Sequence, residues 1–268
     1  MTTVLDTHFA RTKHLLDETR ATLGRHPGKL PLDVQQEFER FCDAEREIDH
    51  WRGTLGARAA ARALMTGLER EVDVTNNTVM LNGNAVGARD ARVLVVQAYV
   101  GATWALSDSI TRSVGRVLCV AEPGRNDATP AQLMTDFLGR SSPKRSAGLS
   151  HSMRLLFGWP VGISYALRNH FIHDGGHLNG YDFFAGPMAS AAFEIATPAW
   201  SQIENRATST YDVASTMIRP GVAWPAPPTA DLRTVLDVCE RELDEALGVL
   251  LVSSSQSVRA HLALLLGE

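Results

Sequence analysis

The sequence predicts a mainly α-helical protein, a helical bundle that carries a small β-hairpin. Long stretches of the chain place apolar residues three and four positions apart, which is the spacing of an amphipathic helix. One short stretch has instead the strand and turn pattern of a hairpin. Hydrophobic residues make up 44% of the 268 residues and charged residues 21%. This balance is ordinary for a globular chain and excludes wholesale disorder.

The N-terminal part of the chain predicts two helices followed by the hairpin. Helical spacing runs through residues 4–23, and the Gly- and Pro-rich stretch 24–31 breaks it. A second helical region occupies residues 32–70, with mixed charges that indicate a solvated helical layer. In residues 72–86, the pair Asn82-Gly83 accepts the positive φ angles of a tight hairpin turn.

The strongest helix in the chain is predicted over residues 88–121. It is apolar on most sides, which marks a buried central helix, and Gln97 is the polar residue that interrupts its longest apolar run. Residues 153–173 predict one helix or a broken pair of helices, because Gly158-Trp159-Pro160 should interrupt the regular pattern.

Irregular structure is expected between these helices and after them. Residues 122–150 are loop-like around a short segment at 130–138. Residues 193–196 and 209–213 predict short strands or loops, and the proline-rich residues 220–228 predict a rigid connector.

The last helix is predicted to start near residues 229–231 and to carry apolar residues at helical spacing. No internal repeat is present. We expect two regions: residues 1–87 form an N-terminal helical region with the hairpin near 72–86, and residues 88–268 form a helical domain.

Charge, cysteine content and hydropathy exclude several classes of protein. The formal net charge is −4 and the pI is near 6.1, so no global basic field draws the chain to nucleic acid, although a basic patch can still form locally. Cys42, Cys119 and Cys239 are far apart and odd in number; they form no metal-ligand pair and no obvious disulfide framework, which points to a reducing interior. The N-terminus lacks a signal-peptide layout, and the apolar run 93–106 is shorter than the ~20 residues that cross a bilayer. We expect a cytoplasmic protein without a membrane segment.

The densest group of chemically active side chains lies at residues 168–177. This block holds three of the nine histidines, together with an arginine, an asparagine and an aspartate, and includes Gly175-Gly176. In a helix, Asn169 and His173 share a face because they are four residues apart, and Arg168 lies one step round. We therefore expect these three side chains to reach one ligand.

The three residue types suit the cleavage of RNA without a metal. The planar fork of Arg168 can donate two hydrogen bonds to a phosphate, and His173 can transfer a proton near neutral pH. In such a reaction a base activates the ribose 2′-OH and a cation stabilises the charge on the phosphorane. The amide of Asn169 can hold the imidazole or a ribose hydroxyl in place.

The pattern of Arg168, Asn169, three further residues and His173 resembles the HEPN superfamily (higher eukaryotes and prokaryotes nucleotide-binding domain). Its ribonuclease members carry an arginine, a polar residue, a few more residues and then a histidine. Asp174-Gly175 is similar to the residues that often come next. The motif ends a helix, a long apolar helix precedes it and an amphipathic helix closes the chain. The resemblance covers about residues 88–253.

The resemblance implies a HEPN-like helical bundle with extra N-terminal helices, and an RNA endonuclease that needs no metal or other cofactor. HEPN ribonucleases act as homodimers in which two motif copies face across one cleft, and many serve in toxin–antitoxin or antiviral defence. The implied partners are RNA, a second copy of the chain, and an antitoxin or other regulatory protein. Arg168 would stabilise the scissile phosphate, His173 would be the general acid and base, and Asn169 would position the phosphate or ribose. Asp108 would be a supporting carboxylate on an earlier helix, or else would pair with Arg112.

The other polar residues of the block have weaker assignments. His170 lines the cleft or is solvated, and the direction of His177 is open because the two glycines precede it. Asp174 matters chiefly for a metal site. Arg168 and His173 could instead cap a helix C-terminus, where the helix dipole favours cations. The chain would then be a non-catalytic HEPN-like binding module.

A metal site is the alternative interpretation of the same block. His173-Asp174 also looks like the signature of the HD phosphohydrolases, in which the metal ligands would include His151 upstream and Asp231 or Asp237 downstream. Gly175-Gly176 would weaken the helix that this pair needs by about 1 kcal/mol each. The preceding arginine and asparagine would also go unused. A third interpretation is a non-enzymatic interaction module.

Overall fold

The computed structural model describes most of the chain. The described residues are 3–26, 28–68, 72–73, 76–118, 144, 146–156, 158–173, 183–185, 193–211 and 231–267. The predicted segments at 130–138 and 220–228 lie outside these ranges, as do Asp174, His177 and Cys119.

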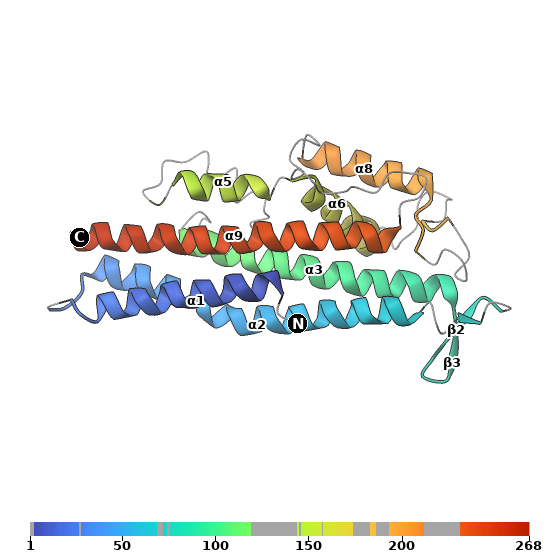
Figure 1. The fold of residues 1–268 in the computed structure, drawn as a ribbon, viewed down its shortest axis with the longest axis horizontal. Coiled ribbons are helices and arrows are strands. Elements are labelled where there is room, and N and C mark those ends of the chain that lie inside the picture. The colour runs from blue at the N-terminus through green and yellow to red at the C-terminus, as the bar shows by residue number, and fades with distance from the viewer. Residues whose placement is uncertain are drawn as a thin grey trace. The chain divides into compact units, whose positions relative to one another are not determined.

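The protein is mainly α-helical, as the sequence predicted, whereas the likeness to the HEPN bundle stays a prediction (Figure 1). The helices are α1 (Val4–Leu23), α2 (Leu32–Leu68), α3 (Ala88–Leu118), α5 (Ala147–Leu155), α6 (Trp159–Arg168), the π-helix η1 (Asn169–His173), α8 (Thr197–Tyr211) and α9 (Leu232–Leu266). The strands are β1 (Val72–Asp73), β2 (Thr78–Leu81) and β3 (Asn84–Gly87).

The predicted hairpin is confirmed, and a third short strand extends it. The sheet is antiparallel with the order β1-β2-β3. Asn82 and Gly83 form the turn between β2 and β3 with φ angles of 51° and 80°. Both angles lie in the left-handed region, which asparagine tolerates and glycine adopts at no steric cost.

The sequence left open whether residues 153–173 form one helix or a broken pair of helices. The structure shows a break between α5 and α6. Gly158 caps the start of α6 in an extended conformation, and Pro160 lies in the first turn. A proline is tolerated there because the first backbone N–H groups of a helix have no intrahelical acceptor.

Helix α8 contradicts the strand or loop predicted over residues 209–213 as far as Tyr211, and residues 212 and 213 lie outside the described ranges. Trp200, Ile203 and Ala207 are buried at three- and four-residue spacing, and α8 packs against α6 (Figure 1). The β-branched and aromatic residues at its end favour strands locally, but packing of the helix overrides that preference.

Two compact units make up the chain, and each is discontinuous in sequence. Unit 1 consists of Met1–Gly53, Leu106–Phe157 and Leu243–Glu268. Unit 2 consists of Thr54–Ala105 and Gly158–Glu242. Helices α2, α3 and α9 are each divided between the units, with one segment in unit 1 and the other in unit 2. The predicted division had a single boundary, after residue 87. The two units of the structure have several boundaries along the chain.

Unit 1 is held by an apolar cluster and by ion pairs between its helices. The cluster includes Leu16, Leu23, Val34, Phe41, Val117, Val258 and Leu262. Arg20 of α1 pairs with Glu45 of α2 at 2.6 Å. Lys144 forms a buried ion pair with Glu37 and also donates to the carbonyl of Val117 at 3.0 Å, so it joins the ends of two helices.

Within unit 1, His8 of α1 lies directly against Gly248 of α9. A Cβ atom at position 248 would lie 2.2 Å from Cδ2 and 2.5 Å from Cγ of the His8 ring. Nonbonded carbon atoms prefer separations of about 3.5–4.0 Å. With the His8 ring in this position, only a glycine fits at position 248.

The substitution Gly248→Ala is expected to lower the free energy of unfolding by about 1–3 kcal/mol, because the new methyl group displaces the His8 ring. This loss should outweigh the ~1 kcal/mol gained in helix propensity. Urea denaturation followed by circular dichroism measures the change. The double variant His8→Ala/Gly248→Ala should recover most of the loss. Gly53→Ala is the matched control, since its new methyl group would meet no atom within 4 Å. Equal effects of the two glycine substitutions would contradict the account.

Within the described residues, α3 and α9 are long and apolar enough to cross a membrane by length and composition alone. Buried core helices of soluble proteins pass the same test, and 50% of the apolar window of α3 and 44% of that of α9 are buried inside the protein. These helices do not decide between a membrane and the cytoplasm, so the cytoplasmic location stays a prediction.

Candidate functional site

The three side chains assigned to the working site lie together in the structure. Arg168 is the last residue of α6, and Asn169 and His173 are the first and last residues of η1. The Nη1 atom of Arg168 donates to Oδ1 of Asn169 at 2.9 Å and lies 2.8 Å from Nε2 of His173. One guanidinium nitrogen therefore connects all three residues.

The direction of these hydrogen bonds follows from the chemistry of the groups. A guanidinium has five N–H donors and no acceptor, so Nε2 of His173 must accept from Nη1 of Arg168. In this contact the imidazole is neutral and carries its proton on Nδ1. The two hydrogens of Nη1 are both used, whereas Nε and Nη2 of Arg168 make no hydrogen bond to any described residue. These two atoms form the planar fork that suits two oxygens of a phosphate.

The π-helical turn brings Arg168 and His173 together. Each residue of an α-helix turns the chain by about 100°, so residues five apart lie about 140° away from each other around the helix. A π-helix has a wider turn, with i→i+5 hydrogen bonds, and aligns such residues. The sequence predicted a shared face for Asn169 and His173 in an ordinary helix, and it did not predict the wide turn.

Buried aromatic side chains hold this turn in place. Phe171 is fully buried, and its ring meets that of Phe183 edge to face with centroids 4.7 Å apart. His170 is also fully buried, stacked on Phe183 at 4.9 Å. The next two residues, Ile172 and His173, are exposed. The buried pair therefore anchors η1, and the turn directs His173 towards solvent.

The remaining predicted residues have different positions. The sequence left His170 either lining the cleft or exposed to solvent. In the structure its side chain is fully buried in the aromatic core, so it is not exposed to solvent. Asp108 lies on the part of α3 that belongs to unit 1, whereas Arg168 belongs to unit 2. Asp174 and His177 lie outside the described residues. The supporting roles of these residues stay predictions.

Comparison with known proteins gives no further guide to the site. No protein-family model, curated protein or solved structure matches the chain.

Metal ligation requires several side chains to converge. Within the described ranges, no group of three His, Cys, Asp or Glu side chains could hold a metal ion. His151 is exposed on α5, and the proposed ligand Asp174 is outside those ranges. Nε2 of His173 is engaged by the cationic Arg168, an arrangement that suits phosphate chemistry better than metal binding.

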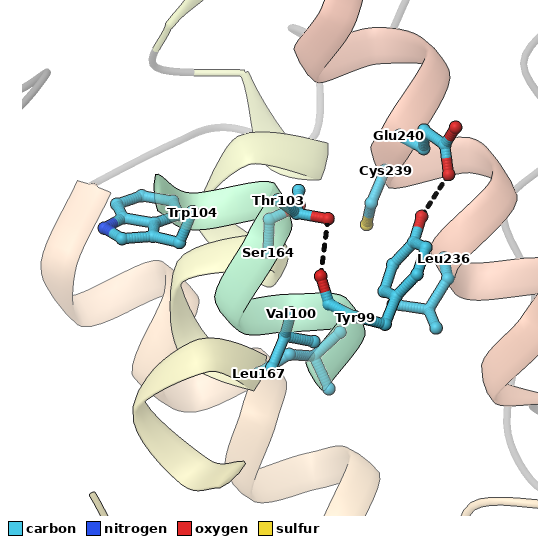
Figure 2. A pocket seen from close by; sticks show the side chains of 9 residues that line it. All are labelled: Tyr99, Val100, Thr103, Trp104, Ser164, Leu167, Leu236, Cys239 and Glu240. Carbon is cyan, nitrogen blue, oxygen red and sulfur yellow. Dashed lines mark hydrogen bonds between the residues drawn. The ribbon is translucent and has the colours of Figure 1, made fainter. Parts of the chain in front are cut away.

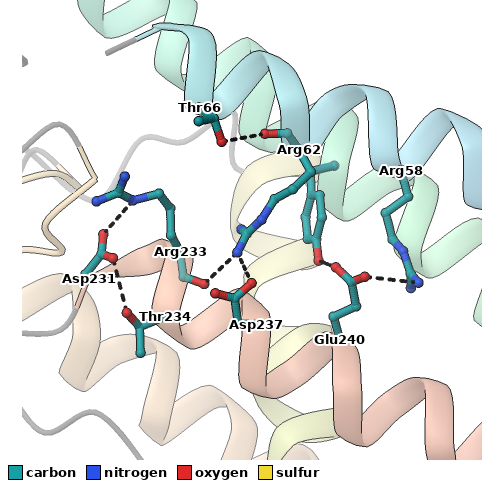
Figure 3. A network of polar contacts seen from close by, with 9 residues as sticks. Arg58, Arg62, Thr66, Asp231, Arg233, Thr234, Asp237 and Glu240 are labelled. Atoms are coloured by element: carbon teal, nitrogen blue, oxygen red, sulfur yellow. Dashed lines mark hydrogen bonds and ion pairs between the residues drawn. The ribbon is translucent and has the colours of Figure 1, made fainter. Parts of the chain in front are cut away.

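A second polar cluster joins α2, α3 and α9 in unit 2, and the sequence did not predict it (Figure 3). Glu240 accepts a hydrogen bond from the hydroxyl of Tyr99, and its other carboxylate oxygen lies 3.3 Å from the buried Arg58. Arg62 pairs with Asp237, and its guanidinium lies 5.6 Å from the centre of the Tyr99 ring. Burial, and secondly the charge of Glu240, raise the pKa of Tyr99 above its usual range. These contacts pair opposite charges, which indicates a structural role.

An apolar pocket lies beside this cluster (Figure 2). Its walls come from Tyr99, Val100, Thr103, Trp104, Ser164, Leu167, Leu236, Cys239 and Glu240. The hydroxyl groups of Thr103 and Ser164 both donate to backbone carbonyls of their own helices, at 2.9 Å. The pocket therefore offers few polar groups and does not suit a phosphate.

Cys239, on the wall of this pocket, is expected to be unreactive in the folded protein. Its exposed fraction is 3%, and burial raises the pKa of its thiol to about 12. At pH 8 only about one such thiol in ten thousand is ionised, compared with about a quarter for an ordinary thiol. Iodoacetamide at pH 8 should label Cys239 only after denaturation, as read by peptide mass spectrometry, and the half-buried Cys42 should react faster. Similar labelling rates of Cys239 in the folded and denatured protein would contradict this.

The same shift in the pKa of Cys239 predicts a loss of stability at high pH. The unfolded chain releases the thiol proton near pH 8.5, and the folded protein releases it near pH 12. This group therefore lowers the free energy of unfolding as the pH rises between these two values.

Proposed function

We propose that the chain is a metal-independent RNA endonuclease of the HEPN type, which cleaves RNA through attack of the ribose 2′-OH. The observation that carries the proposal is the convergence of Asn169 and His173 on Nη1 of Arg168. A phosphate-binding cation and a neutral imidazole at hydrogen-bond distance are the two groups that this reaction requires.

In the proposed reaction, Nε and Nη2 of Arg168 bind two oxygens of the scissile phosphate. Nε2 of His173 exchanges its contact with Arg168 for the ribose 2′-OH and accepts that proton. The 2′-oxygen forms a bond to phosphorus, and the bond from phosphorus to the 5′-oxygen breaks. The second histidine, which is His173 of the second subunit in its protonated form, gives a proton to the leaving 5′-oxygen. The products are a 2′,3′-cyclic phosphate and a 5′-hydroxyl.

The proposal includes a homodimer. Ile172 precedes His173 and is 43% exposed, so a bulky apolar side chain stands at the edge of the site. A second subunit would cover it and supply the second histidine. The proposal also places the protein in the cytoplasm, in a prokaryotic defence or toxin–antitoxin role with an antitoxin or another regulatory protein as its partner.

The test is cleavage of single-stranded RNA by the purified protein in EDTA, with analysis of the product ends. The proposal expects cleavage that leaves 2′,3′-cyclic phosphates and that is lost in Arg168→Ala and His173→Ala. Activity that disappears with the chelator and returns with a divalent metal would overturn the proposal and favour the HD-type site. No cleavage, together with a stable complex with a second protein, would favour an interaction module.

A further inference from the structure

Gln97 is a polar residue within the apolar run of α3, and it contacts the turn that carries His173. Its side-chain Nε2 donates to the backbone carbonyl of Phe171 at 2.7 Å. The two residues are 74 positions apart, so the bond joins two helices within unit 2.

The carbonyl of Phe171 lies in the last turn of η1 as the structure describes it. The last four carbonyls of a helix have no intrahelical partner, and η1 ends at His173, two residues after Phe171. The Phe171 side chain is fully buried in the aromatic core. A buried carbonyl without a hydrogen bond costs about 1–3 kcal/mol. Gln97 supplies such a donor from α3.

The same stretch of α3 lies close to Ile172 one helical turn further on. A Cβ atom at Gly101 would lie 3.7 Å from Cδ1 of Ile172, which is an ordinary packing distance. Gln97 and Gly101 are four residues apart and therefore share a face of α3. This face donates a hydrogen bond to Phe171 and lies close to the next residue, Ile172.

We propose that Gln97 is a positioning residue for the site formed by Arg168, Asn169 and His173. By holding the Phe171 carbonyl, it fixes the wide turn that aligns residues five apart and sets the His173 ring on Nη1 of Arg168. Its effect on cleavage rests on the proposed ribonuclease function, whereas its effect on the orientation of His173 does not.

The test uses Gln97→Met, which keeps the length of the side chain and removes the donor. Nitrogen NMR of the His173 imidazole reports which ring nitrogen carries the proton, and His173→Ala assigns the signal. The wild type should show the Nδ1-protonated form, and Gln97→Met should show a mixture of forms. With RNA, kcat should fall up to about 100-fold while KM changes little, because a misplacement of about 1 Å can cost that much.

Three further variants separate positioning from general stability. Gly101→Ala adds a methyl group beside the same turn and removes no hydrogen bond. It should therefore match the wild type in both the imidazole signal and kcat. Gln97→His keeps a donor nitrogen at a similar reach and should recover part of kcat. Gln97→Leu also lacks the donor and adds no charge, and it replaces Gln97→Met if that variant does not fold.

The outcomes distinguish the two proposals. If the wild type does not cleave RNA, the proposed function fails, and the imidazole signal still tests Gln97. If the wild type cleaves RNA and the donor-free variant keeps the wild-type signal and kcat, the inference about Gln97 is overturned. The inference is also overturned if the donor-free variant loses kcat but keeps the wild-type imidazole signal, and Gln97→His does not restore kcat.

Discussion

His173→Ala is expected to reduce the rate of RNA cleavage by about 10²–10⁴-fold, which is the usual contribution of a general acid or base. The His173 side chain is exposed, so the free energy of unfolding should change by no more than about 0.5 kcal/mol. The measurement is the single-turnover rate of cleavage in EDTA, together with urea denaturation of the same preparation. A wild-type rate in this variant would contradict the proposed chemistry.

His151→Ala is the matched control for this substitution. His151 is also an exposed histidine, but it lies on α5 and is required only by the metal-site alternative. The proposed function expects the wild-type rate for His151→Ala. A loss of activity in both variants would point to shared metal ligation.

Lys144→Met is expected to lower the free energy of unfolding by about 3–5 kcal/mol, because removing one partner of a buried ion pair leaves the other charge without compensation. Lys144 and Glu37 are only 6% and 5% exposed. The substitution also removes the donor to the Val117 carbonyl. Urea denaturation measures the change, and the midpoint of thermal unfolding should fall by about 2–4 °C for each kcal/mol.

Two variants test the cause of this effect. Lys144→Met/Glu37→Met replaces the whole pair with apolar side chains and should come within about 1 kcal/mol of the wild type. Arg46→Met removes one partner of an exposed pair with Asp43, and it should cost less than about 1 kcal/mol. A cost below about 1 kcal/mol for Lys144→Met would show that the buried pair contributes little.

The sequence predicted the long helices and the three clustered side chains because both depend on local patterns. Apolar spacing placed α1, α2 and α3 within a few residues of their observed bounds and located the start of α9, and Asn82-Gly83 located the hairpin turn. The pairing of Arg168 with His173 followed from the presence of a cation and an imidazole within one or two helical turns.

Other features depend on contacts between distant parts of the chain. The π-helical turn is stabilised by Phe183 and by Gln97, and no local pattern signals either contact. Gln97 did stand out as a polar residue in an apolar run, but its acceptor lies 74 residues away. The sequence also did not predict the close approach of α1 to α9. A glycine within a helix can have many causes, and only the position of His8 in the structure explains the need for glycine at position 248.

The hydrogen bonds of Arg168 have a consequence for the entropy of binding. A free arginine or lysine side chain has about 2 kcal/mol of rotamer entropy, and a ligand that immobilises it must overcome that cost. Here Nη1 is already held by Asn169 and His173, so much of this freedom is lost when the chain folds. A phosphate that reaches the remaining fork of Arg168 would meet a pre-organised receptor, and most of its interaction energy would remain available as affinity.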